Sequence, residues 1–283
     1  MNASGPAPAA GRDGQASVPE GLVSAVVSLV GTGPVLLGAY TSAELAAVDA
    51  VVDFLETRPS DEVLAEAVRS LAARQLLVAG AAEASGSAGS GSAGSGSAGG
   101  QVQVQGDLGV AVAFQQRARV VLDARVTGTE TGEPWRILLL PQPEGICLQF
   151  RIDALGIHQV GLYQLDEALN ALADWLPRGS RADSGDPVEA DALLAAAERA
   201  ALLTVTRYDV KGSAETAGAS TDLVLARKDD RLHVLARDRS DRSKLVPSPQ
   251  GDKELPDLLA GLLALRPARG GATRPGRPAG RGR

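Results

Sequence analysis

Hydrophobic and polar positions alternate in short segments through the second half of the chain, and these segments fall into two groups that each end in a run with helical spacing. The first group has strand-like segments at 119–126, 135–140, 146–153 and 158–163 and a helical run at 165–176. The second has them at 202–210, 223–227, 231–238 and 243–246, with a helix at 252–265. In both groups the helix begins about 50 residues after the first strand. The pattern predicts an α+β fold made of duplicated antiparallel sheet-plus-helix units with approximate two-fold symmetry.

The clearest strand is 146–153, where Ile146, Leu148 and Phe150 alternate with Cys147 and Gln149. A period of two with one apolar side predicts a strand that has one buried face and one solvated face. We therefore expect antiparallel sheet with a wet side, and Cys147 on that exposed side. The leucines of the two helical runs repeat every three or four positions, so each helix is expected to cover one face of the sheet.

The N-terminal part, residues 19–83, is predicted to be mainly helical. Helices are expected at 19–29, 42–56 and 60–77, a buried strand at 34–40 and a further strand at 101–105. Helices followed by a hairpin outline a winged-helix-like part. Residues 22–40 hold no charge and approach the length that crosses a bilayer, but Gly31, Gly33 and Pro34 interrupt them, so no membrane span is expected.

Composition sets the limits of the folded region. We expect residues 1–18 and 266–283 to be disordered, 84–100 to be a Gly/Ser/Ala linker, and the two units to span 101–178 and 186–265. The single cysteine fits a reducing cytoplasm.

The charge is unevenly distributed along the chain. The net charge is −6, but residues 266–283 hold six arginines and no acid, which leaves residues 1–265 with 22 basic and 34 acidic side chains, net −12. A solvated tail is the expected state of this segment. No aromatic residue lies among its arginines to stack on bases, so nucleic acid is not an expected partner.

Candidate catalytic groups are few. His158 and His233 fall at different places in the two groups, and no residue pairs them into a ligand set. Asp229 and Asp230 suit a hairpin turn, and Asp166 and Glu167 suit the start of a helix. The segment 238–241 has too few oxygen ligands for calcium. We therefore expect no catalytic, cofactor-binding or metal-binding residues, no cofactor, and no enzyme activity.

The order of elements carries a resemblance. The strand-like 34–40, the string Leu71-Ala-Ala-Arg-Gln-Leu-Leu-Val78, a wing, the strand at 117–126 and the paired units resemble the EspG family over residues 19–265. The family comprises cytosolic proteins of ESX, or type VII, secretion in actinobacteria. This chain departs from the usual members in the 84–100 insertion, the lack of tryptophan in the first helix, and the Arg-rich tail.

The resemblance implies a cytoplasmic, non-enzymatic adaptor or chaperone that binds PE–PPE-like helical secretion substrates. It places contacts on loops of the central sheet and on helices beside the last unit, but assigns no single contact residue. Leu258, Leu259 and Leu262 have helical spacing that is typical of core. Two alternatives remain: a winged-helix transcriptional regulator reading DNA through Arg69 and Arg74, and an enzyme with a pocket between the two units.

Overall fold

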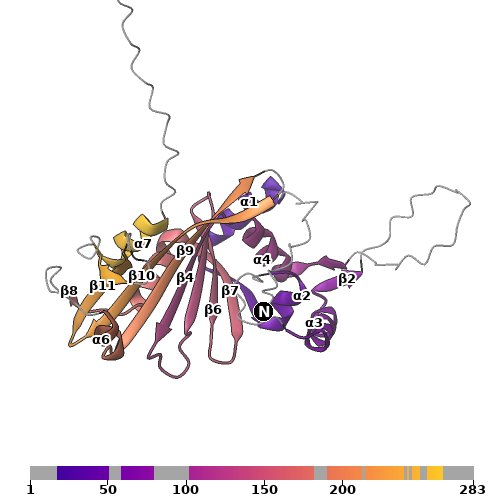
Figure 1. The fold of residues 1–283 in the computed structure, drawn as a ribbon. Coiled ribbons are helices and arrows are strands. Elements are labelled where there is room, and N and C mark those ends of the chain that lie inside the picture. The colour runs from indigo at the N-terminus through magenta and orange to yellow at the C-terminus, as the bar shows by residue number, and fades with distance from the viewer. Residues whose placement is uncertain are drawn as a thin grey trace, which may run out of the picture.

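The fold is built on one wide, mostly antiparallel sheet (Figure 1). The computed structural model describes residues 18–50, 59–79, 102–181, 190–211, 214–238, 241, 244–248 and 254–263. Within these residues the sheet has ten strands, in the order β1-β7-β6-β5-β4-β9-β10-β11-β12, and β8 pairs in parallel with β11. The strands are β1 (Val35–Thr41), β4 (Val120–Thr127), β5 (Arg136–Pro141), β6 (Ile146–Ile152), β7 (Ile157–Gln164), β8 (Ser180–Arg181), β9 (Arg199–Lys211), β10 (Ala214–Lys228), β11 (Arg231–Arg237) and β12 (Leu245–Pro247).

Helices are distributed over both sides of this sheet. They are α1 (Glu20–Val30), α2 (Ser42–Ala47), α3 (Asp61–Ala73), α4 (Gly106–Arg117), α5 (Leu165–Trp175), α6 (Ala190–Ala195) and α7 (Leu255–Leu263). A small separate hairpin pairs β2 (Leu77–Ala79) with β3 (Val102–Val104). In the part of the chain that the structure describes, no helix is both long and apolar enough to cross a membrane.

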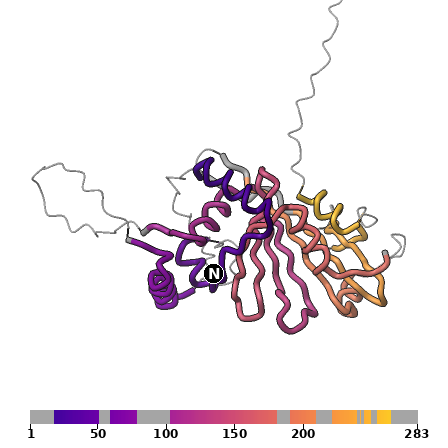
Figure 2. Tube along the Cα trace, turned by 180° about the vertical axis from the view of Figure 1, so that it is seen from behind, coloured from indigo at the N-terminus to yellow at the C-terminus, as the bar shows by residue number. Residues whose placement is uncertain are grey.

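The sheet lies between two main apolar cores. On one face, α5 and α7 pack their leucines on the inward residues of β4, β9, β10 and β11, and Figure 2 shows α7, in yellow, over the C-terminal strands. On the other face, α1, α2, α3 and α4 pack over β1, β7, β6 and β5. A third, smaller core joins α6 to Ala226 and Leu235 on this second face. The mixed α+β class and the antiparallel sheet are thus as the sequence predicts.

The expectation of a solvated face on β6 is wrong. Ile146, Leu148 and Phe150 face the N-terminal helices, and Cys147, on the opposite side, packs in the core beneath α5. Cys147 is fully buried, not exposed. Helices cover both faces along most of this strand and bury Gln149 as well as Cys147, although Arg151 near its end is exposed, so alternation in sequence does not by itself identify a wet face.

Two of the N-terminal helices, α2 and α3, are shorter than predicted, whereas α1 lies within one residue of its predicted bounds. The helix after β1, α2, begins at a capping box in which Thr41 and Glu44 each accept a hydrogen bond from the backbone of the other. It ends at Ala47 instead of residue 56, and residues 51–58 lie outside those described. α3 ends at Ala73 because Gln75 adopts a φ of 59° and Leu76 donates its N–H to the Leu71 carbonyl, 2.9 Å away. The chain then enters β2, whose first residue, Leu77, lies in the segment predicted to be helix.

Two helices were missed by the sequence prediction, α4 and α6. α4 holds Gly106, Gly109 and two valines, which are poor helix formers, and it is held by Leu108, Ala111 and Phe114 packing in the second core. The predicted linker 84–100, the tail 266–283 and all but the last residue of the segment 1–18 lie outside the described residues.

Candidate binding surface on the open sheet face

Of the residues that the structure describes, no helix covers the middle of the sheet on the side of α6. Figure 1 shows the front of β4 and β9 without a helix between α6 and the N-terminal helices. Pairing places Arg125 beside Leu202 and Val224 in one row across β4, β9 and β10, and Asp123 beside Thr204 and Asp222 in the next row. We call the surface formed by Arg125, Leu202, Thr204, Asp222, Val224 and Arg237 the open face.

One end of the open face rests on a buried ion pair. Arg136 of β5 donates from Nε and Nη2 to the two Asp123 carboxylate oxygens, at 2.9 and 2.8 Å, in the bidentate geometry that guanidinium and carboxylate favour. Both side chains are buried. Arg125, two residues along β4 on the same side, donates to Asp123 Oδ2 at 3.1 Å. These contacts fix the Arg125 guanidinium at the edge of the open face.

The other end is organised around Asp222 of β10. Thr204 Oγ1 donates to Asp222 Oδ1 at 3.0 Å, and Arg237 Nε donates to Asp222 Oδ2 at 2.7 Å. Because these residues come from β9, β10 and β11, the bonds also tie three strands together. The aspartate is therefore held by two neighbours, and Arg237 is aimed across the sheet surface.

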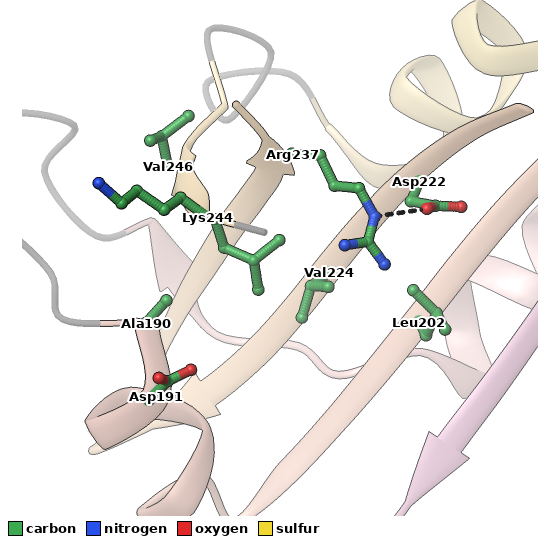
Figure 3. Close-up of a pocket in the computed structure, with 9 residues that line it drawn as sticks. Ala190, Asp191, Leu202, Asp222, Val224, Arg237, Lys244 and Val246 are labelled. Carbon is green, nitrogen blue, oxygen red and sulfur yellow. Dashed lines mark hydrogen bonds and ion pairs between the residues drawn. The ribbon is translucent and has the colours of Figure 1, made fainter. Parts of the chain in front are cut away.

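A pocket of about 290 Å³ lies between this aspartate and α6. Its floor and outer wall are apolar, and its rim is charged (Figure 3). Figure 3 shows that the Arg237 guanidinium is directed over Val224. Asp191 lies across the pocket, on α6. The lining residues are Ala190, Asp191, Leu202, Asp222, Val224, Arg237, Lys244, Leu245 and Val246. A space of this size and mixed lining accepts an apolar side chain or a small amphipathic group.

The histidines do not come together. His158 is buried on β7, where its Nδ1 lies 3.1 Å from the Gly156 carbonyl oxygen, while His233 lies on β11 beyond the centre of the sheet. Burial, reinforced by the charge of Arg136, lowers the pKa of His158. The neutral form is favoured, which suits a structural histidine.

Cys147 has no character of a nucleophile. Burial raises the pKa of the Cys147 thiol to about 12, so it stays protonated at neutral pH.

The acidic residues that the sequence singles out at 229–230 and 238–241 have structural roles in turns. Asp229 and Asp230 occupy the β10–β11 turn with φ of 52° and 58°, and Asp238 Oδ1 accepts from the Asp241 N–H at 3.0 Å. The described residues contain no group of three or more His, Cys, Asp or Glu side chains placed to hold a metal ion.

The two arginines considered for DNA reading are engaged within the protein. Arg69 pairs with Glu66 on α3 at 2.7 Å, and Arg74 donates to Glu44 at 3.0 Å while its guanidinium lies 5.2 Å from the centre of the Tyr40 ring. As expected from their spacing, Leu258, Leu259 and Leu262 are buried in the core.

Sequence reasoning missed the open face. One signal was available: Asp123 and Arg125 interrupt an otherwise apolar strand, and charged residues in such a strand need partners when the sheet is covered. Comparisons with protein-family models and with curated proteins found no match for this chain.

Proposed function

We propose that this protein is a non-enzymatic adaptor or chaperone that binds a helical secretion substrate, of the type VII kind, in the cytoplasm. The open face is the observation that carries this proposal. It combines a central apolar strip, Leu202 and Val224, with charged side chains around it, which is the composition of a protein-binding patch. Leu202 remains 36% exposed although it lies near the middle of a ten-stranded sheet. A partner helix laid across β4, β9 and β10 would remove this residue from water.

The proposed architecture is a duplication that builds this surface at its centre. The sheet reads β7-β6-β5-β4 on one side and β9-β10-β11-β12 on the other, so strands of equal rank in the two groups lie at mirrored distances from the β4–β9 pair. α5 and α7, which close the two groups, pack on the same face and contact each other. The N-terminal part, with α3 and the β2–β3 hairpin, belongs in this proposal to the winged-helix-like element.

Purification of the tagged full-length chain from its native host, with quantitative mass spectrometry, tests the function. The expected result is one pair of small helical secreted proteins at one-to-one stoichiometry with the chain. Recovery of nucleic acid in place of a protein partner would favour the regulator alternative, and recovery of the chain alone would contradict the adaptor function.

A further inference from the structure

In three ion pairs around the open face the cation is more exposed than its carboxylate partner, while Asp191 adds an exposed acid on the α6 side of the pocket. Arg125 has 39% of its side chain exposed while its partner Asp123 has 11%, and Arg237 has 43% while its partner Asp222 has 18%. At the outer rim of the pocket, Lys244 has 73% exposed against 45% for Asp241. In each pair the carboxylate holds its cation in place, and the cation is the more exposed of the two.

Apolar surface lies between these cations. Leu202 and Val224 occupy the row that begins at Arg125, and the pocket continues this apolar floor to Leu245 and Val246. Arg125 on β4 and Arg237 on β11 are separated by β9 and β10, so about three strand spacings, or about 14 Å, lie between their strands. The Arg237 guanidinium is directed back over Val224 on β10, so the two cations are about two strand spacings apart, which is close to the rise of two turns of an α-helix.

From this arrangement we infer that the open face binds an acidic amphipathic helix of the partner. One apolar side chain of that helix enters the pocket over Leu202 and Val224, and carboxylates one or two turns to either side contact Arg125 and Arg237. Asp191, the acidic group on the α6 side of the rim, disfavours a carboxylate there and orients the acidic edge toward Arg237. This inference deepens the proposed function by specifying the partner's chemistry, and it rests on that function.

The charge of the rest of the chain limits where else an acidic helix could bind. Residues 1–265 carry a net charge of −12, so most of the folded surface repels an acidic helix, and the six arginines of 266–283 are the competing place where one could bind. A useful test must therefore separate the open face from the tail.

The test uses two synthetic amphipathic helices of about 20 residues. Both carry the same leucine stripe; one has glutamate and the other lysine along both edges of the stripe. Fluorescence anisotropy measures the binding of each to the full-length chain and to Leu202→Asp and Arg237→Glu. Arg151→Glu, which changes an exposed arginine on β6 away from the open face, is the matched control. Circular dichroism confirms that each variant is folded.

We expect the glutamate helix to bind at least about tenfold more tightly than the lysine helix, and each open-face variant to weaken it by about tenfold or more while Arg151→Glu leaves it unchanged. Equal affinity for the two helices, or no binding of the glutamate helix, would overturn the inference. Binding that both open-face variants retain would place the helix on the arginines of 266–283 and would equally overturn it. If a stoichiometric helical partner is recovered from the host but these peptide results fail, the adaptor function stands and the binding surface is wrong.

Discussion

Glu44 joins two helices and a strand through one carboxylate. It accepts hydrogen bonds from the Thr41 N–H at 2.9 Å, from Ser70 Oγ at 2.8 Å and from Arg74 at 3.0 Å. Burial alone would raise the pKa of Glu44, but these bonds and the positive charge of Arg74 outweigh it and lower the pKa below the usual value. The ionised form is therefore part of the native structure.

Glu44→Gln is expected to destabilise the protein by about 2 kcal/mol at neutral pH, because it weakens charge-assisted hydrogen bonds to a buried group. Urea unfolding measures the change. A lowered native pKa gives stability that is complete above the unfolded value of about 4.3 and is lost as the pH falls through the native pKa. The difference in unfolding free energy between wild type and Glu44→Gln should therefore become smaller at acid pH. Glu62→Gln, on the exposed first turn of α3, is the control; an equal loss there would contradict the role given to Glu44.

His158 should make the free energy of unfolding depend on pH near neutrality. Its native pKa lies below the ordinary 6.5, so between these two values the unfolded chain binds a proton that the native protein does not. Stability is complete above about pH 6.5 and falls as the pH is lowered through this window. His158→Gln is expected to flatten the dependence of unfolding free energy between about pH 7 and about pH 5. An unchanged slope in the variant would show that the His158 ring does not titrate in this way.

At the scale of the element, the β4–β5 turn makes a close approach to β9. Gly128 has a φ of 72°, and a Cβ at this position would lie 2.9 Å from the Glu198 carbonyl oxygen; Gly132, in the same turn, has a φ of 88° with open space around it. Both substitutions to alanine meet backbone strain, but only Gly128→Ala also meets a fixed backbone atom.

Gly128→Ala should accordingly cost about 1 kcal/mol or more beyond Gly132→Ala in unfolding free energy. Thermal or denaturant unfolding of the two variants measures the difference directly, and Gly132→Ala corrects for the strain that they share. Equal costs would mean that the turn moves away from β9 without loss.

The strands were predictable because their period is local. The predicted segment 146–153 agrees with β6 within one residue, and the segments 119–126 and 135–140 agree with β4 and β5 within one residue at each end. What covers each face was not predictable from the same pattern. Cys147 is buried by α5, which follows β6 after one turn and the strand β7, and α4 is stabilised by packing that outweighs its poor helix-forming residues.

The open face could not be predicted from local sequence pattern either, because it depends on how strands pair. Arg125, Leu202 and Arg237 are far apart in sequence and come together only through the pairing of β4 with β9, of β9 with β10 and of β10 with β11. Register between strands that are not neighbours in sequence depends on the whole sheet. Asp123 in an apolar strand signalled that a buried partner was needed, but not that Arg136 supplies it.

At the scale of the whole molecule, the sheet gives the protein two unequal sides. Among the described elements, α5 and α7 cover the centre of one side, and the N-terminal helices and α6 cover the two ends of the other. The exposed strip between those ends carries apolar side chains and outward-pointing cations. The proposed binding surface lies on this side, so disruption of the strip should release a bound partner without unfolding the chain.

Side-by-side purification of wild type, Leu202→Asp and Arg151→Glu from the native host tests this assignment most directly. We predict one helical protein pair bound one-to-one to wild type and to Arg151→Glu, and at least about a tenfold lower recovery with folded Leu202→Asp. Recovery of the same pair in equal amount with Leu202→Asp, or no stoichiometric partner with wild type, would contradict the account.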